Sequence, residues 1–287
     1  MNASLLLQIS RPGLWLVFIW LYIWPTGGNW ELMSSLKFWL GFVYITFPLN
    51  LLVYGMNDLV DTDTDSKNKR KGNYVFGAKA SLKQMGYLPF FIALFNLPFM
   101  ILFGLVSGDW LFWVSWFLSA FLINAAYNWK PLTLSRRAPW ELPTMILGHL
   151  LIPLLSCHLN KIGLPGNGSW IFHCLLLARS HIWLEIMDIN EDSESNKRTI
   201  AVVIGEVHAL TLVVVITFLE SFIGFVLLKS NLLGFFSLFG ALVLITMTIA
   251  EKLKLIKVDK RHACISQSVV GVIVMIVLWL NGTIVNN

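Results

Sequence analysis

The stretch 57–65 of the chain concentrates acidic side chains. It holds four aspartates within nine residues, Asp58, Asp61, Asp63 and Asp65, and it follows directly on the apolar run 38–56. Carboxylates so close together repel one another, and a bound divalent cation is the simplest way to hold them in place. Several Lys and Arg residues follow at once, between residues 67 and 71. The spacing therefore indicates a metal-binding segment with cations beside it.

A second acidic segment lies more than a hundred residues later. Together the two segments hold 9 of the 16 acidic residues of the chain. Each runs into the same tripeptide, Asn-Lys-Arg, at 68–70 and at 196–198. This repetition argues against two unrelated solvated faces. The members of the second segment are Glu185, Asp188, Glu191, Asp192 and Glu194.

Helical spacing predicts that both segments present polar stripes. The first stripe comprises Asn50, Tyr54, Asn57, Asp58, Asp61 and Asp65, and the second comprises His181, Glu185, Asp188 and Asp192. Asp63 points off the first stripe, and we leave it out of the predicted site. Charged stripes on otherwise apolar helices must avoid lipid. We therefore expect the two stripes to line one cavity.

The residue types favour one metal and one class of ligand. Carboxylates without Cys partners suit a hard, oxygen-seeking ion, which favours Mg²⁺ over Zn²⁺. Protein-bound Mg²⁺ usually bridges carboxylates to a phosphate, and Lys and Arg are natural partners of phosphate oxygens. The apolar surroundings indicate that the rest of the ligand is lipid-like.

The composition places the chain among multi-spanning membrane proteins. Of its 287 residues, 56% are hydrophobic and only 13% are charged. The net charge of +5 does not predict nucleic-acid binding, because the basic residues lie in short loops between apolar runs. We predict an all-α fold with nine transmembrane helices around a central cavity. The predicted spans are 12–26, 36–56, 86–106, 110–128, 139–157, 169–187, 207–229, 232–251 and 266–285.

The loops predict the orientation of the chain in the membrane. Loops 57–85, 128–138, 188–206 and 251–265 hold 16 of the 21 Lys and Arg residues. By the positive-inside rule these loops and the N-terminus are cytoplasmic, and the C-terminus lies on the opposite side. Both acidic segments then face the cytoplasm. The sequence leaves open whether the membrane is a bacterial inner membrane, the endoplasmic reticulum or an organellar membrane.

These residues resemble the UbiA superfamily of intramembrane prenyltransferases. The first family motif, NDxxDxxxD, is matched from Asn57 to Asp65, and the second, DxxED, is matched from Asp188 to Asp192. A basic-Thr segment follows the second motif, as in the family. The loop that begins at Tyr127 and the N-terminal Ser10-Arg11-Pro12 also match. The resemblance covers nearly the whole chain and implies a single domain over 1–287, with loops 66–85 and 193–206 as cytoplasmic caps.

The resemblance also implies a reaction. Mg²⁺ would bridge the two acidic motifs to an isoprenyl diphosphate, the allylic C–O bond would break, and a lipophilic acceptor would capture the prenyl group. Asp61, Asp188 and Tyr127 are the predicted catalytic residues. The predicted metal ligands are Asn57, Asp58, Asp61, Asp65, Asp188 and Asp192. The predicted diphosphate-binding residues are Arg11, Lys69, Arg70, Lys130, Arg136, Arg137, Lys197 and Arg198.

Some roles and functions stay open at this stage. Tyr127 contacts diphosphate or acceptor, or it is an interfacial aromatic anchor. Asn50, Tyr54, His181 and Glu185 are predicted to line the acceptor or prenyl pocket. For His181 and Glu185 the alternative is a buried structural pair. A terpene cyclase needs the same ionisation as a prenyltransferase, and a transporter with an acidic vestibule is a non-enzymatic alternative. The acceptor could be an aromatic quinone precursor or an isoprenoid such as a carotenoid.

Overall fold

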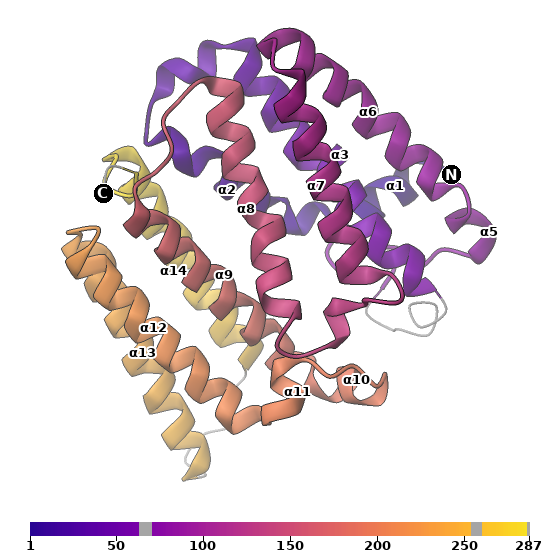
Figure 1. The fold of residues 1–287 in the computed structure, drawn as a ribbon. Coiled ribbons are helices and arrows are strands. Elements are labelled where there is room, and N and C mark those ends of the chain that lie inside the picture. The colour runs from indigo at the N-terminus through magenta and orange to yellow at the C-terminus, as the bar shows by residue number, and fades with distance from the viewer. Residues whose placement is uncertain (63–70, 254–259, 286–287) are drawn as a thin grey trace. The chain divides into compact units, whose positions relative to one another are not determined.

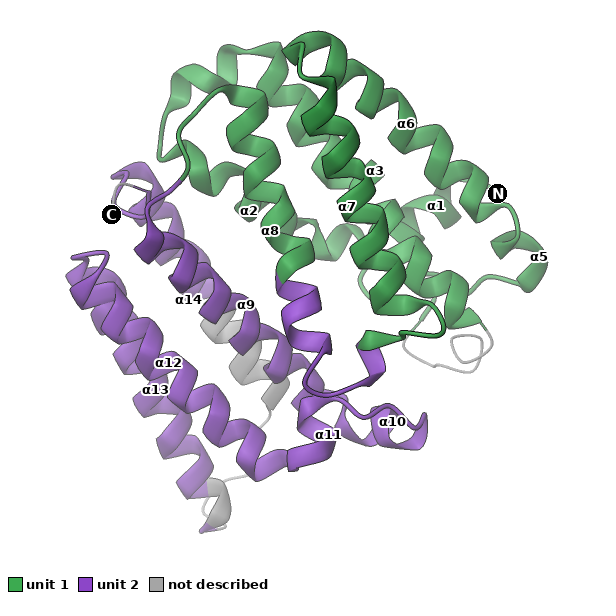
Figure 2. Ribbon diagram, in the orientation of Figure 1, with its two compact units in different colours: residues 1–134, 147–164 green, residues 135–146, 165–287 purple. Residues whose placement is uncertain are grey.

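The computed structural model describes residues 1–62, 71–253 and 260–285, with backbone alone for 251–252 and 260–268. The described chain is helical and contains no strand, only two isolated bridges, Asn73 with Gly77 and Arg137 with Arg198. Its contacts divide it into two compact units (Figure 2). Unit 1 contains 1–134 and 147–164, and unit 2 contains 135–146 and 165–287. The predicted single domain remains a prediction.

Unit 1 is built around one long helix, α3, which packs against α1, α2, α6 and α7 (Figure 1). Its helices are α1 (Ala3–Ser10), α2 (Trp15–Ile23), α3 (Leu36–Val60), α5 (Leu82–Met85), α6 (Leu88–Ser107), α7 (Trp110–Asn128) and the second part of α8 (Glu141–Asn160). Short 3₁₀ turns at Pro12–Leu14, Trp24–Thr26 and Trp30–Ser34 complete it.

Buried polar contacts fix the register of α3. Tyr44 donates to Oδ1 of Asn96 on α6 at 3.1 Å, and the Asn96 amide donates to the Pro48 carbonyl at 3.1 Å. Tyr22 on α2 donates to the carbonyl of Phe38 at 2.8 Å. Gly41 lies against the Tyr22 side chain, where a Cβ atom would come within 2.8 Å of the hydroxyl oxygen and two ring carbons. Each bond satisfies a polar group that burial in an apolar unit would otherwise leave unpaired. The end of α3 is thereby held in a defined position.

Unit 2 contains the first part of α8 and six further helices. They are α9 (Asn167–Met187), α10 (Ile189–Glu194), α11 (Ile200–Ile204), α12 (Glu206–Val226), α13 (Asn231–Lys252) and α14 (Lys260–Leu280). The helix α12 packs against α13 and α9, and α11 packs against both α9 and α12. A buried apolar cluster that includes Ile182, Ile186 and Ala201 joins these helices. The 3₁₀ turn Leu134–Arg136 lies at the boundary of the two units.

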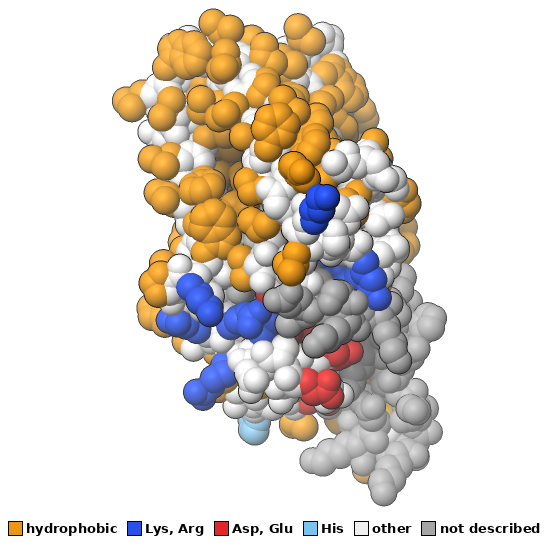
Figure 3. Space-filling model, turned by 90° about the vertical axis from the view of Figure 1, so that its right-hand side faces the viewer, with side chains coloured by type: hydrophobic (Ala, Val, Ile, Leu, Met, Phe, Trp, Pro, Cys, Tyr) orange, Lys and Arg blue, Asp and Glu red, His pale blue; other side chains and the backbone are white. Residues whose placement is uncertain are grey.

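The helices are those of a membrane protein. Within the described residues, seven helical segments are long and apolar enough to cross a bilayer. The surface agrees, because α6 exposes Phe90, Leu97 and Leu105, and Figure 3 shows hydrophobic side chains over much of one face with Lys and Arg gathered below them. The chain is thus an all-α multi-pass membrane protein, as predicted.

The predicted count of nine spans is not confirmed. The sixth predicted span is a 21-residue helix, α9, but it carries Arg179, His181 and Glu185 and is not among the seven apolar segments. The ninth lies in α14, whose described apolar part covers only Val269–Leu280. The tight hairpins predicted at 107–109 and 229–231 are present: α6 ends at Ser107 before α7 begins at Trp110, and α12 ends at Val226 before α13 begins at Asn231.

Candidate active site

The first acidic segment lies at the end of α3. The helix ends at Val60, and Asp61 caps it by donating its backbone N–H to the Asn57 carbonyl at 3.0 Å. Asn57, Asp58 and Asp61 therefore leave the last turn of one helix, as the predicted stripe requires. Three predicted site residues, Asp65, Lys69 and Arg70, lie outside the described residues.

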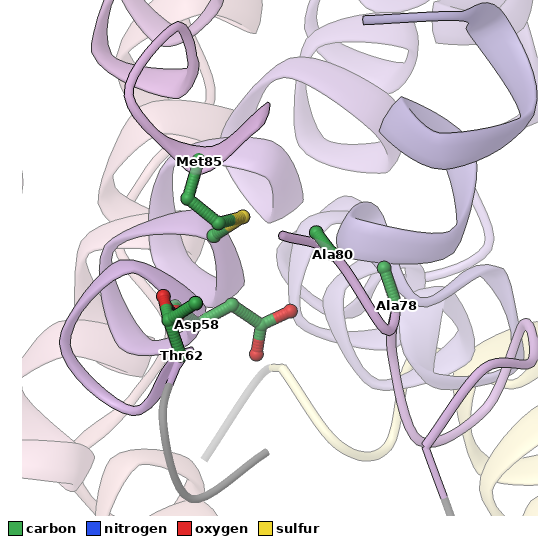
Figure 4. Close-up of a pocket in the computed structure, with 5 residues that line it drawn as sticks. All are labelled: Asp58, Thr62, Ala78, Ala80 and Met85. Carbon is green, nitrogen blue, oxygen red and sulfur yellow. Dashed lines mark hydrogen bonds between the residues drawn. The ribbon is translucent and has the colours of Figure 1, made fainter. Parts of the chain in front are cut away.

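Asp58 is buried and engaged by two cations. Its side chain is 4% exposed, and a single oxygen, Oδ1, accepts from the Arg11 guanidinium at 2.5 Å and from the Lys71 ammonium at 2.7 Å. Figure 4 shows the carboxyl pointing from the α3 end toward Ala78 and Ala80, across a pocket of about 10 Å³ that has space for one water. Two segments distant in sequence are thus anchored on one carboxylate.

The backbone around this ion cluster is adapted to it. Arg11 ends α1 in the left-handed conformation, with φ of 50°, and its guanidinium lies over the Tyr54 ring at 4.6 Å from the centroid. Gly77 covers the cluster with φ of 95°, and a Cβ there would lie 2.9 Å from Nε of Arg11 and 3.2 Å from Oδ2 of Asp58. Glycine is required both for the conformation and for the space.

Asn57 joins the first acidic segment to the end of α7. Its amide donates to Oδ1 of Asn128 at 3.0 Å, and the Asn128 amide donates in turn to the carbonyl of Asn124 at 3.0 Å. Tyr127 precedes Asn128 and is half-buried, and Lys130 follows in the exposed loop. Unit 1 therefore brings four predicted site residues, Asn57, Asp58, Tyr127 and Lys130, to connected segments of the chain.

Asn50, deeper in α3, is fully buried and bonds within its own helix. Its amide donates to the carbonyls of Ile45 at 2.7 Å and Thr46 at 2.6 Å. Its Oδ1 has no hydrogen-bond partner among the described residues. That free acceptor, and the Tyr54 ring held under Arg11, are the features available to the predicted acceptor or prenyl pocket.

The second acidic segment breaks its helix. The sequence predicted one continuous stripe, but α9 ends at Met187, Asp188 links the helices, and a short α10 follows. The bond from the Asp192 N–H to the Asp188 carbonyl, at 2.9 Å, keeps these two residues one turn apart. The spacing of the two aspartates therefore survives the break.

Asp192 is less completely neutralised than Asp58. Nζ of Lys197 lies 3.4 Å from Oδ1 of Asp192, and the two side chains are 29% and 15% exposed. Partial burial raises the pKa of the Asp192 carboxyl, the Lys197 charge opposes that shift, and the neighbouring Asp188 charge adds to it. An approaching cation would relieve this repulsion between carboxylates.

Glu185 faces the backbone of α11. Its Oε2 accepts from the Ala201 N–H at 3.2 Å. Nε2 of His181 lies 3.2 Å from Oε1 of Glu185, although that contact lacks hydrogen-bond geometry. Glu141, at the start of α8, makes the matching contact, with Oε1 accepting from the Ile200 N–H at 2.7 Å. Glu141 was missed by the sequence reasoning, because its only signal was an acid at the start of a predicted span.

The predicted diphosphate-binding residues of unit 2 lie on two paired segments. Arg198 donates its N–H to the Arg136 carbonyl at 3.1 Å, and its own carbonyl accepts from Ala138 at 2.7 Å. Four predicted diphosphate-binding residues, Arg136, Arg137, Lys197 and Arg198, are thereby carried on one pair of loops joined by backbone hydrogen bonds.

Elsewhere in the unit, Arg179 is paired with the buried Glu220 of α12 at 2.7 Å, which satisfies its charge within an apolar helix.

The oxygen ligands of the two acidic segments suit magnesium as pairs, not as a complete coordination shell made of protein side chains. Among the described residues no group of three or more His, Cys, Asp or Glu side chains is close enough to hold a metal ion. Mg²⁺ sites commonly supply only one or two carboxylates and complete the shell with water and phosphate. Asp61 with Asn57, and Asp188 with Asp192, are oxygen-only sets of that kind, so the residues fit a phosphate-bridged Mg²⁺.

Comparison with known proteins places the chain in a family. The model of the UbiA prenyltransferase family matches residues 13–269. The fold is that of solved family members: a UbiA homologue from Archaeoglobus fulgidus, determined with GPP and Mg²⁺, has a TM-score of 0.65 at 16% identity and covers 97% of this chain and 98% of its own. The chain is a member of the UbiA prenyltransferase family.

Two curated relatives carry the same functional name. A lycopene elongase/hydratase from Corynebacterium glutamicum is 31% identical over 188 residues, which cover 64% of this chain and 64% of the relative. A lycopene elongase/hydratase from Haloarcula japonica is 27% identical over 206 residues, which cover 70% of this chain and 67% of the relative. The match thus spans less than two thirds of the length of the Corynebacterium relative and about two thirds of that of the Haloarcula relative.

Proposed function

We propose that this protein is a Mg²⁺-dependent intramembrane prenyltransferase that moves an isoprenyl group from a prenyl diphosphate to a lipophilic acceptor and releases diphosphate. The observation that carries the proposal is the family match over 13–269, which contains both acidic segments with their aspartates at the spacing the family motifs require. Two further supports are the helical membrane fold and the oxygen-only donor sets.

Most of the proposed site residues divide into three roles. Asn57, Asp61, Asp188 and Asp192 are the metal ligands we propose within the described chain, with Asp65 outside it. Bound there, Mg²⁺ would neutralise diphosphate oxygens and so make diphosphate a better leaving group. The basic residues supply further positive charge; within the described chain they are Arg11, Lys130, Arg136, Arg137, Lys197 and Arg198. Tyr127 is proposed as a contact for diphosphate or acceptor.

Asp58 receives a different role from its neighbours. It matches the family motif and is predicted from sequence as a metal ligand. However, Arg11 and Lys71 already occupy its Oδ1, and its side chain is 4% exposed. We propose that Asp58 holds these two cations in place, because a carboxylate that compensates two buried charges is poorly disposed to bind a third cation.

The apolar helices determine the fate of the prenyl group. When the allylic C–O bond breaks, its electron pair leaves with diphosphate and a carbocation remains. A site enclosed by apolar helices excludes water from that cation until a double bond of the acceptor attacks it. The new cation on the product then either loses a proton to form a double bond, or adds a water molecule and loses a proton from it to form an alcohol. In these steps Asp61 and Asp188 would only hold the Mg²⁺ that binds the leaving group.

The acceptor we propose is a long linear isoprenoid of the carotenoid class. The support is the shared name of the relatives, which describes elongation and hydration of lycopene. An aromatic quinone precursor is the competing acceptor, and a terpene cyclase is the competing reaction. We also propose that the active-site face and the N-terminus are cytoplasmic and the C-terminus is opposite, from the distribution of Lys and Arg among the loops.

The experiment uses the purified full chain in lipid nanodiscs. It is incubated with dimethylallyl or geranyl diphosphate and Mg²⁺, with lycopene, with a 4-hydroxybenzoate acceptor, or with neither. We expect pyrophosphate release that EDTA abolishes, and a lycopene product heavier by one or more prenyl groups. Pyrophosphate release with a cyclised product and no acceptor would favour the cyclase. Absence of pyrophosphate release with every prenyl diphosphate would overturn the enzymatic proposal.

A further inference from the structure

The segment 197–201 is anchored at four of its five residues. Lys197 donates its N–H to the Asp192 carbonyl at 2.9 Å, and Arg198 is paired with the segment 136–138 through two backbone bonds. Ile200 donates to Glu141 at 2.7 Å and Ala201 donates to Glu185 at 3.2 Å. We call residues 197–201 the basic strap. All of these contacts lie within unit 2.

Glu141 and Glu185 cap the N-terminus of α11. The first N–H groups of α11, which begins at Ile200, have no partner within the helix, and Thr199 before it makes no side-chain cap bond. Glu141 and Glu185 arrive from two other helices, α8 and α9, and each accepts from one of these N–H groups. Carboxylates at a helix N-terminus form charge-assisted bonds and favour its dipole. One short helix is thus tied to two long ones.

Burial makes these contacts difficult to replace. Glu141 is 0% exposed and Glu185 is 5% exposed, so both carboxylates meet the strap amides away from water in the folded protein. Oε2 of Glu141 and Oγ1 of Thr199 are buried and have no hydrogen-bond partner among the described residues. Each glutamate therefore commits a single oxygen to the backbone, and these two bonds are what fix the strap's C-terminal end.

We propose that Glu141 and Glu185 are positioning residues that hold the basic strap, so that Lys197 and Arg198 are presented to a diphosphate. Through the backbone pairing of the two segments, they also hold Arg136 and Arg137 in place. The inference rests on the proposed function for the identity of the ligand. The sequence predicted that Glu185 lines an acceptor or prenyl pocket; the role proposed here is instead to position the strap by accepting from the Ala201 N–H. Neither glutamate touches the reacting atoms.

The test separates an acceptor of a backbone bond from a generic buried charge. In Glu141→Gln and Glu185→Gln an amide oxygen can still accept from the strap N–H, whereas in Glu141→Ala and Glu185→Ala nothing accepts. Glu31→Ala, an exposed glutamate of unit 1, is the matched control. The KM for geranyl diphosphate should rise roughly tenfold to a hundredfold in the Ala variants, with kcat changed less, and stay within about threefold in the Gln variants.

Hydrogen–deuterium exchange supplies a readout that does not depend on activity. Without any substrate, the amides of 198–201 should exchange faster in the Ala variants than in the wild type, the Gln variants and Glu31→Ala. Unchanged exchange at these amides in both Ala variants would overturn the positioning role, even if activity fell. If the wild type released no pyrophosphate, the proposed function would fail, while faster exchange would still show that the glutamates hold the strap. If the Ala variants do not fold, a Gln variant with KM raised as far as a hundredfold would equally contradict the inference.

Discussion

The two acidic segments both concentrate carboxylates, but their electrostatics differ. In the first, Asp58 is 4% exposed and binds both Arg11 and Lys71 through one oxygen, at 2.5 and 2.7 Å. In the second, Asp192 is 15% exposed and has Lys197 at 3.4 Å, with a pKa raised by burial. We propose that the first segment uses this carboxylate to hold two cations of the protein in place. Asp192 in the second segment has its charge less fully compensated, which is the condition that favours a bound cation.

The comparison is tested most severely by removing one aspartate from each segment. Asp61→Ala and Asp188→Ala should each lower pyrophosphate release by about a thousandfold or more, because each removes a charge that holds the metal at the leaving group. Membrane insertion and size-exclusion profiles should stay those of the wild type. Near-normal turnover in both variants would break the assignment of the two segments to one reaction.

Stability should separate Asp58 from Asp192. Asp58→Asn leaves Arg11 and Lys71 buried around a neutral side chain, and breaking a buried pair in this way typically destabilises by about 3–5 kcal/mol. Asp192→Asn removes a carboxylate with one partly exposed partner, and we expect a loss of no more than about 1 kcal/mol. Thermal unfolding of both variants in the same detergent measures the difference. Equal shifts in Tm would show that the two carboxylates are equally structural.

Gly77 tests the covering of the first segment. Gly77→Ala forces a side chain into a φ of 95° and places its Cβ 2.9 Å from Nε of Arg11. We expect a destabilisation of roughly 1–3 kcal/mol, as for other strained positions. The control is Gly163→Ala in the same unit, where a Cβ has nothing within 4 Å. A Gly77→Ala protein with the wild-type Tm would mean that the loop does not pack on the ion cluster.

The smallest expected effect concerns the cation of the second segment. Lys197→Ala removes a partner that is 29% exposed and 3.4 Å from Asp192. Partly exposed ion pairs contribute about 0–1 kcal/mol, so the Tm should hardly move. The KM for geranyl diphosphate should still rise, since the proposed role of Lys197 is to bind diphosphate. Loss of stability comparable to that of Asp58→Asn would erase the contrast between the segments.

The helices were predictable because hydrophobicity is local. The span predicted at 110–128 coincides with α7, and the span predicted at 36–56 is α3 with one further turn. The break at Asp188 was not predictable, since helical spacing continues through it and the N–H bond from Asp192 to Asp188 survives. The count of nine spans was not confirmed, since α9, which carries Arg179, His181 and Glu185, is not among the seven apolar segments and the described apolar part of α14 covers only Val269–Leu280.

The sequence predicted which residues belong to the site, but not which ion pairs they form. The motifs identified Asp58, but its partners Arg11 and Lys71 lie 47 and 13 residues away, and no spacing rule links them. Arg179 lies within the membrane-length helix α9 and needs a partner for its charge, and Glu220, 41 residues later, supplies it only once α9 and α12 pack together. Long-range pairing of this kind comes from tertiary packing and leaves no periodic signal in one sequence.

The central claim is that Asp192 serves the metal while Asp58 serves the fold, and a magnesium titration tests it most directly. Pyrophosphate release from geranyl diphosphate is measured against Mg²⁺ concentration for the wild type, Asp192→Asn and Asp58→Asn at a temperature where all three are folded. We predict that half-saturation rises about tenfold or more in Asp192→Asn and is unchanged in Asp58→Asn. A rise in Asp58→Asn as large as that in Asp192→Asn would contradict the account.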